Sequence, residues 1–233
     1  MGSIKENIDK VISIMDEAAQ QAGRRPCEVV LCAVTKTRGP DEINEAIRAG
    51  VTDIGENKVQ EILDKYDFVD PVRWHMIGHL QTNKVKYIID KVDLVHSVDS
   101  VRLAEEIDRR AKQYGKVMDV LIQVNPAKEE SKFGIGAEEA DALINHILEN
   151  CANIRVKGLM CMAPFTENPE DAASYFAETR ELYEKHAKAG RQERLDFSVL
   201  SMGMSNDYAV AVREGSSLIR VGTAIFGERD YKK

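Results

Sequence analysis

The sequence lacks the features typical of secreted, membrane-bound and nucleic-acid-binding proteins. No apolar run approaches the length that spans a membrane, and the N-terminal segment is charged rather than apolar, unlike a secretory signal. The formal net charge of −7 disfavours a dedicated binder of nucleic acid or anionic membranes, although it leaves room for a local basic pocket that holds one phosphate. We therefore expect a cytoplasmic protein with no membrane or nucleic-acid partner.

The four cysteines have neither a zinc-binding spacing nor the density of a disulfide framework. Cys32 and Cys161 lie inside apolar runs, which is typical of small buried residues in a reducing compartment. His75 and His79 are four residues apart, but they fall on a predicted strand and its exit, where two side chains do not face one metal ion as they would on a helix. We predict no metal site.

Eight short apolar segments alternate with seven helical segments along the 233 residues. This alternation predicts a parallel sheet with right-handed crossovers, and eight units in this length predict one closed (β/α)8 barrel domain, residues 1–233, that begins with a helix over 3–22. An open doubly wound sheet is the alternative, which the lack of a G-x-G-x-x-G fingerprint after an early strand disfavours. The predicted strands cover residues 29–34, 52–54, 73–77, 94–96, 118–124, 155–160, 196–200 and 217–221, and the helices between them run through 40–49, 59–63, 85–89, 100–113, 140–147, 176–182 and 206–213.

The first predicted strand ends in a lysine, Lys36, just before a turn signal at 37–40. A lysine at the rim of a buried strand loses hydration, so its amine tends to lose a proton and become a nucleophile of the kind that forms Schiff bases. The alternative is a lysine that only extends to solvent at the end of a strand.

Other polar residues follow the remaining strands, and in a (β/α)8 barrel the carboxyl ends of the strands form the site. Asn57 and His79 each follow a run that we expect to be buried, so simple surface exposure explains them poorly. Lys132, in the long loop 125–136, is a weaker candidate because most exposed lysines have no special role. The residues at the strand ends are Lys36, Asn57, His79, Ser97, Asn125, Met162, Ser201 and Gly222.

The loops after strands seven and eight, 201–205 and 222–224, are the usual phosphate site of such a barrel. Both offer glycine, a hydroxyl and free backbone amides, although ordinary turns explain the glycines about as well. Arg220 lies within the apolar run 218–221, and a buried arginine should be paired or functional. A structural ion pair with a carboxylate such as Glu56 is the alternative for this arginine.

Taken together, several motifs resemble the pyridoxal phosphate homeostasis protein family over nearly the whole chain. The resemblance implies a barrel like the N-terminal domain of alanine racemase, with pyridoxal 5′-phosphate (PLP) at its mouth. The motifs are Val34-Thr35-Lys36, Gly55-Glu56-Asn57-Lys58-Val59-Gln60-Glu61, Trp74-His75-Met76-Ile77-Gly78-His79-Leu80-Gln81-Thr82-Asn83-Lys84, Gly158-Leu159-Met160, Ser201-Met202-Gly203-Met204-Ser205 and Arg220-Val221-Gly222-Thr223-Ala224-Ile225-Phe226-Gly227.

The resemblance also implies a role for each matching residue. Lys36 matches the lysine that holds PLP covalently as an internal aldimine, and Arg220 matches the arginine that faces the pyridine nitrogen. The phosphate-binding positions match Ser201, Gly222 and Thr223, and the pocket-lining motifs contain Asn57 and His79.

An arginine at the ring nitrogen disfavours its protonation, so bound PLP should be a weak electron sink. The chain also ends after the barrel, without the second domain that supplies a racemase with its second base and its dimer. We therefore expect a monomeric, non-catalytic carrier that maintains the balance of B6 vitamers and delivers PLP to apo-enzymes.

Two other functions are open at this point. One is an enzyme, either a weak amino-acid racemase or a Schiff-base lyase that acts on a sugar-phosphate aldehyde with Glu56 or His79 as the base. The other is a regulatory module whose partners recognise the PLP-loaded state.

Overall fold

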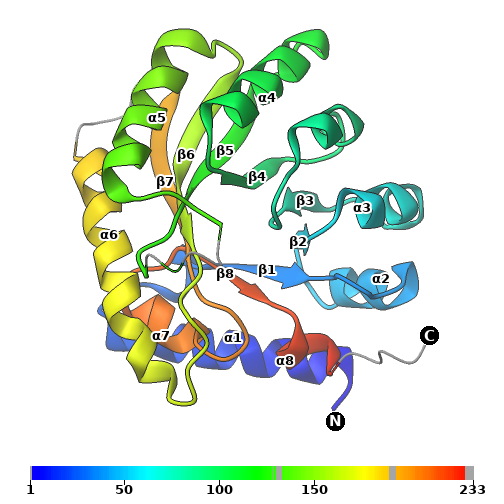
Figure 1. Cartoon of the computed structure of the whole chain (residues 1–233). Helices are drawn as coiled ribbons and strands as arrows, with labels where there is room; N and C mark the ends of the chain where they lie inside the picture. Colours follow the sequence, from blue (N-terminus) through cyan, green and yellow to red (C-terminus); the bar gives the residue numbers. More distant parts are fainter. Residues whose placement is uncertain (1, 128, 130–132, 189–192, 229–233) are drawn as a thin grey trace.

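Eight parallel strands close into a barrel in chain order, so the predicted (β/α)8 barrel is confirmed and the open sheet is excluded (Figure 1). The computed structural model describes residues 2–127, 129, 133–188 and 193–228. β1 pairs with both β2 and β8, which closes the barrel. The strands are β1 (Val30–Val34), β2 (Asp53–Glu56), β3 (Arg73–Met76), β4 (Leu94–Val98), β5 (Met118–Val124), β6 (Ile154–Cys161), β7 (Leu195–Ser201) and β8 (Leu218–Val221).

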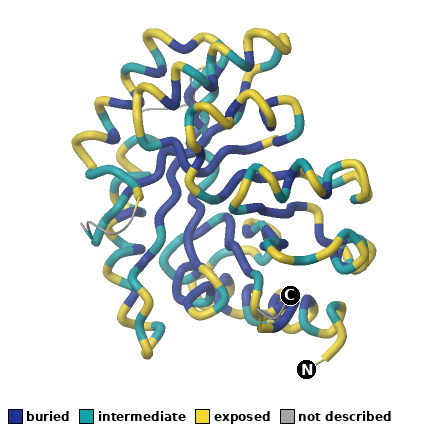
Figure 2. Tube along the Cα trace, turned by 45° about the vertical axis from the view of Figure 1, so that its right-hand side comes forward, coloured by how far each residue is buried: buried dark blue, intermediate teal, exposed yellow. Residues whose placement is uncertain are grey.

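The crossovers cover the outside of the barrel, and their outward faces are exposed while the strands are buried (Figure 2). Within the described part of the chain, no helix has the length and apolar character needed to cross a membrane. The outer helices are α1 (Ile4–Gln21), α2 (Pro40–Arg48), α3 (Val59–Lys65), α4 (Val101–Gln113), α5 (Ala137–Asn150), α6 (Ala173–Ala187), α7 (Tyr208–Arg213) and α8 (Thr223–Phe226), with short 3₁₀ helices η1 (Pro26–Glu28), η2 (Tyr66–Phe68), η3 (Thr82–Tyr87) and η4 (Pro169–Ala172).

The first helix completes the outer wall of the barrel. Ser3 caps α1 and forms a capping box with Glu6, which fixes the start of the helix. The buried face of α1, including Ile8 and Val11, packs against the short helices α7 and α8 and against α2. α8 is a single turn and covers little of the barrel, so α1 covers the part of the wall next to the last strand that a longer final helix would cover.

One predicted helix, over 85–89, is wrong. Residues 85–87 instead belong to the 3₁₀ helix η3, which ends in a turn where the amide of Ile88 bonds to the carbonyl oxygen of Val85, three residues earlier. A 3₁₀ helix places residues three apart on the same side, and Val85 and Ile88 are both fully buried. Spacing alone could not distinguish this tighter winding from an α-helix.

The inside of the barrel is partly polar. One small apolar cluster fills part of it, and Cys32, Leu94 and Leu218 belong to that cluster. All four cysteines are free thiols, and burial raises the pKa of Cys161 to about 11, so this buried thiol stays protonated. Other interior positions carry buried charged and polar side chains, among them Asp53, His75, His96, Ser201 and Arg220.

Candidate functional site

A cavity of about 720 Å³ lies at the carboxyl end of the strands and contains Lys36; we call it the Lys36 cavity. Its size is within the range of small-molecule sites. Five of the seven predicted site residues line it: Lys36, Asn57, Arg220, Gly222 and Thr223. The rest of the lining comes from Val34, Arg38, Ile77, Met162, Phe165, Met204, Ser205, Asn206, Gly227 and Glu228.

Lys36 follows β1 and is half-buried between a buried residue and a turn. The next residue, Thr37, has φ +66, and it is the one non-glycine residue with positive φ in the described ranges. A β-branched residue in this left-handed region is strained, so neighbouring groups must hold the turn in place.

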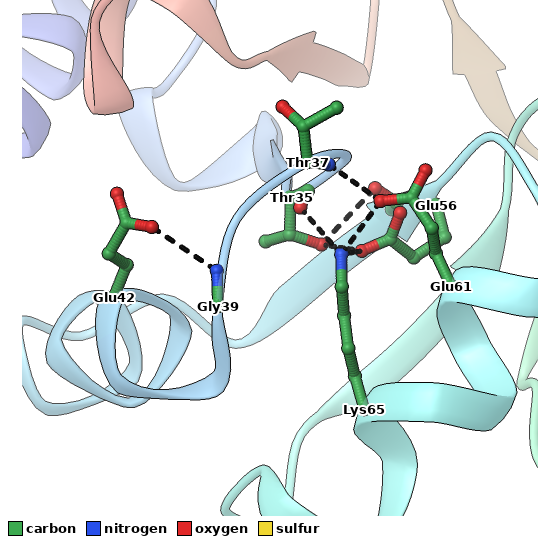
Figure 3. Close-up of polar contacts among 8 residues, drawn as sticks. Thr35, Thr37, Gly39, Glu42, Glu56, Glu61 and Lys65 are labelled. Carbon is green, nitrogen blue, oxygen red and sulfur yellow. Dashed lines mark hydrogen bonds and ion pairs between the residues drawn. The ribbon is translucent and has the colours of Figure 1, made fainter. Parts of the chain in front are cut away.

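A buried lysine from the end of α3 fixes the peptide group before Lys36 (Figure 3). Lys65 Nζ donates to the carbonyl oxygen of Thr35 at 3.0 Å and lies 2.8 Å from Glu56 Oε1. Thr35 Oγ1 donates to the same Glu56 oxygen at 2.7 Å. Burial raises the pKa of Glu56, despite these two donors.

The peptide group after Lys36 is held from the same side. Glu61 Oε2 accepts from the amide of Thr37 at 2.6 Å and lies 2.9 Å from Lys65 Nζ. Burial alone would raise the pKa of Glu61, but the bonds from Thr37 and Lys65 outweigh it and lower the pKa. We call Lys65, Glu56 and Glu61 the Lys65 cluster; sequence analysis missed its role.

Arg220 does not pair with Glu56, so that alternative is wrong. Arg220 is buried, with 4% of the residue exposed. Its guanidinium donates to Ser201 Oγ and, at 2.8 Å, to the carbonyl oxygen of Cys161. Burial lowers the pKa of Arg220 from its ordinary value, but an arginine side chain stays charged in proteins.

The hydroxyl of Ser201 is buried and does not line the Lys36 cavity, because it accepts from Arg220 and contacts His96 Nδ1 at 3.1 Å. The other serine of the 201–205 loop lines the cavity instead. Ser205 Oγ accepts from the backbone amides of Gly222 at 3.2 Å and Ala224 at 3.4 Å. The structure thus gathers a hydroxyl and two amides at one point of the cavity wall.

Glycine is required at position 203 of this wall, and position 222 is tightly packed. A Cβ on Gly203, which has φ +90, would lie 2.6 Å from the Cβ of Ala211, and the carbonyl oxygen of Gly203 accepts from the amide of Arg220. A Cβ on Gly222 would lie 3.1 Å from the carbonyl oxygen of Val34. Both glycines let the loops after β7 and β8 approach β1 and each other closely.

His79 is not in the Lys36 cavity. It is exposed, its ring stacks on Phe133 with 3.9 Å between ring centroids, and it lines a second cavity of about 460 Å³. Asn57 lines both cavities, and its buried Oδ1 has no hydrogen-bond partner among the described residues. Lys132 lies outside the described residues.

Two histidines inside the barrel were also missed. His75 and His96 are buried, with 3.0 Å between His75 Nδ1 and His96 Nε2. The sequence signal is one histidine in each of the predicted strands 73–77 and 94–96, but without the strand register it does not tell which face they occupy. Over the described ranges, no group of three or more His, Cys, Asp or Glu side chains is arranged to hold a metal ion.

Known proteins resemble this chain over nearly its full length. The family model described as the N-terminal domain of alanine racemase matches residues 4–230. A pyridoxal phosphate homeostasis protein of Aquifex aeolicus is 42% identical over 97% of this chain and 98% of its own length. One of Pseudomonas aeruginosa is 39% identical over 99% and 98%. The solved structure of PipY of Synechococcus elongatus with PLP bound is 34% identical, with a TM-score of 0.77, and the match covers 92% of this chain and 100% of that chain.

Proposed function

Since this chain belongs to the pyridoxal phosphate homeostasis protein family, we propose that it binds PLP in the Lys36 cavity and carries it as a Schiff base on Lys36. In this step the amine of Lys36 adds to the aldehyde carbon, a C=N bond forms, and the aldehyde oxygen leaves as water. The observation that carries the proposal is that one cavity contains a lysine, an arginine and a hydroxyl-and-amide turn. The chain, residues 1–233, then acts as one binding domain.

The phosphate end of the cofactor fits the turn made by Ser205, Gly222 and Thr223. Ser205 Oγ already accepts from two backbone amides there, and those donors can serve a phosphate oxygen equally well. The turn approaches β1 closely at Gly222, where a Cβ would lie 3.1 Å from the carbonyl oxygen of Val34. We therefore assign the phosphate to Ser205 in place of Ser201, whose hydroxyl is engaged by Arg220.

The ring end fits the other side of the cavity. Arg220 presents a cation that can donate to the ring nitrogen and disfavours its protonation. Asn57 offers a buried oxygen that lacks a partner in the described structure, which suits a polar substituent of the ring. When bound, PLP supplies an aldehyde for the lysine and an electron sink that this arginine weakens.

We propose a carrier rather than an enzyme. The two bases considered for an enzymatic role lie outside the Lys36 cavity, since Glu56 is bound to Lys65 and His79 lines the second cavity. The relatives' name, which refers to homeostasis, supports the same reading. The chain then stores PLP, limits the free aldehyde, balances B6 vitamers and passes PLP to apo-enzymes.

The test is the absorption spectrum of the purified protein with added PLP, followed by borohydride reduction and peptide mapping. We expect a visible band, lost on reduction, with the cofactor fixed on the peptide containing Lys36. Lys36→Ala should lose that peptide's label, while Lys10→Ala, an exposed lysine on α1, should keep it. A wild-type protein that stays colourless with excess PLP would contradict the proposal, and Lys36-dependent turnover of alanine would contradict the carrier role.

A further inference from the structure

A continuous chain of polar side chains runs through the inside of the barrel. It starts at Arg220 on β8, which lines the Lys36 cavity, and ends at Asp53, the first residue of β2. Each member is no more than 4% exposed. The members, in order, are Arg220, Ser201, His96, His75 and Asp53, which we call the interior chain.

Every link of the interior chain is within hydrogen-bond distance. Arg220 donates to Ser201 Oγ, which lies 3.1 Å from His96 Nδ1. His96 Nε2 lies 3.0 Å from His75 Nδ1, and His75 Nε2 lies 3.1 Å from Asp53 Oδ1. Five strand residues that are far apart in sequence therefore form one connected network.

With one proton on each imidazole, a single arrangement of protons makes every contact of the interior chain a hydrogen bond. The guanidinium of Arg220 has donors only, so Ser201 accepts from it and has one proton of its own to donate to His96 Nδ1. Burial, His75 and Arg220 together lower the pKa of His96 well below its usual value, so this ring carries one proton, which in this arrangement is on Nε2.

The same arrangement continues to the carboxylate. In it, His96 Nε2 donates to His75 Nδ1, and His75 Nε2 donates to Asp53 Oδ1. Burial alone would raise the pKa of Asp53, but hydrogen bonds from His75, Arg73 and Thr52 lower it to about 2, which keeps it a pure acceptor. In this arrangement the donors point from Arg220 to Asp53 along the whole interior chain.

This direction makes the chain a support rather than a proton path. Moving every proton one step toward Asp53 would leave a neutral arginine, which proteins do not stabilise. We propose that His96, His75 and Asp53 are positioning residues that act through Ser201 to hold the guanidinium of Arg220 in one orientation at the Lys36 cavity. Apolar side chains such as Leu94 and Leu218 fill neighbouring interior positions, so the barrel does not need histidines for packing.

The inference deepens the proposed function, because Arg220 is the group assigned to the ring nitrogen of PLP. We expect Ser201→Ala to raise the Kd for PLP about 10-fold, the effect of losing one hydrogen bond to a charged group. His96→Leu, which acts on Arg220 through Ser201, should raise the Kd in the same direction. His96→Asn keeps an acceptor near the Nδ1 position and should restore most of the affinity. His146→Leu, on the outer helix α5, is the control and should bind as wild type.

A double-mutant cycle separates positioning from general structural damage. If His96 acts through Arg220, His96→Leu should not change the Kd further when added to Arg220→Met. Independent effects that add in the double variant would overturn the proposal. So would a His96→Leu variant that loses thermal stability while its PLP affinity stays at the wild-type value.

A measurement without PLP distinguishes failure of this inference from failure of the proposed function. In ¹⁵N NMR of the protein alone, we expect His96 protonated on Nε2 and the Arg220 guanidinium protons protected from exchange. Ser201→Ala should remove that protection. If the wild type shows these signals but binds no PLP, the proposed function fails and the positioning role stands. If Arg220 is unprotected in the wild type, or equally protected in Ser201→Ala, the positioning role fails.

Discussion

At the scale of single residues, side chains outside the cavity determine what the cavity residues can do. Lys36 sits between two peptide groups that the Lys65 cluster holds, next to a strained Thr37. Arg220 is held by the interior chain. In both places buried polar residues outside the Lys36 cavity orient a basic residue that lines it.

The Lys65 cluster gives a first prediction. Lys65→Met leaves Glu56 and Glu61 without their cation, and breaking a buried ion pair costs about 3–5 kcal/mol in the free energy of unfolding. PLP affinity should fall as well, because the peptides on both sides of Lys36 lose their support. Denaturant unfolding and PLP titration check both effects, with Lys10→Met as the exposed control. Wild-type stability in Lys65→Met would contradict the role of the cluster.

The two serines of the 201–205 loop give a second prediction, which separates phosphate from ring. Ser205→Ala should weaken PLP binding about 10-fold, as for one hydrogen bond to a charged group, but leave binding of pyridoxal, which lacks the phosphate, unchanged. Ser201→Ala acts through Arg220 and should weaken both ligands. The check is a titration of each variant with each ligand. If Ser201→Ala weakened only PLP and Ser205→Ala weakened both ligands, the phosphate would be assigned to Ser201 instead.

Asp53 gives a prediction for the stability of the protein at acid pH. Its pKa in the folded state, about 2, is below the ordinary 3.8, so its stabilisation is present above the unfolded pKa and is lost as the pH falls through this window. The shift corresponds to about 2 kcal/mol. Between pH 5 and pH 2, the wild type should therefore lose about 2 kcal/mol more stability than Asp53→Asn. If the free energies of unfolding of the two proteins changed in parallel with pH, the carboxylate of Asp53 would not stabilise the fold in this way.

At the scale of elements, the outer layer is completed by a helix from the other end of the chain. α1 packs against α7, α8 and α2, so the N-terminal residues close the wall next to the last strand. The β8–α8 turn, which we assign to the phosphate, is thereby backed by α1, and Asn7 donates to the carbonyl oxygen of Ile225 at 2.8 Å. The helix that precedes the barrel thus supports the site.

This arrangement predicts a clear contrast between two isoleucines of α1. Ile8 is fully buried, so Ile8→Ala should lower the free energy of unfolding by about 2–5 kcal/mol. Ile12 is 36% exposed, so Ile12→Ala should lower it by less than about 1 kcal/mol. Ile8→Ala should also lower PLP affinity through the α8 turn. Equal costs for both variants in denaturant unfolding would mean that α1 does not pack as described.

At the scale of the whole molecule, ligand binding and folding are coupled. The cavity is built from segments that span the chain, from Val34 to Glu228, and it exists only when the barrel is closed. A ligand that binds the folded state alone stabilises it by mass action. PLP should therefore stabilise the entire barrel and not one local region.

The same relation gives the expected stabilisation by PLP. PLP at a free concentration of 100 times its Kd should stabilise the fold by about 2.7 kcal/mol, which for a chain of this length raises Tm by about 5–10 °C. The increase should be much smaller for Arg220→Met at the same PLP concentration. Calorimetry with and without PLP provides the measurement, and an unchanged wild-type Tm would contradict binding in the Lys36 cavity.

The sequence by itself determined the barrel and the side of it on which the Lys36 cavity lies. Buried strands and amphipathic helices are local patterns, and their alternation leaves a closed parallel barrel as the arrangement that buries both. The position of Lys36, Gly222 and Thr223 at strand ends follows from the same patterns, because the carboxyl ends of parallel strands share one rim. The position of these residues on the rim could therefore be predicted without knowledge of any tertiary contact.

Only the tertiary structure decided which polar groups meet. Whether Ser201, His75 and His96 point into the barrel depends on the register of each strand, since a shift of one residue turns a side chain to the other face. The partner of Glu56 likewise depended on how α3 packs against β2, which brings Lys65 rather than Arg220 to this carboxylate. The contacts His75–His96 and His96–Ser201 join residues 21 and 105 positions apart in the chain, and no local pattern encodes them.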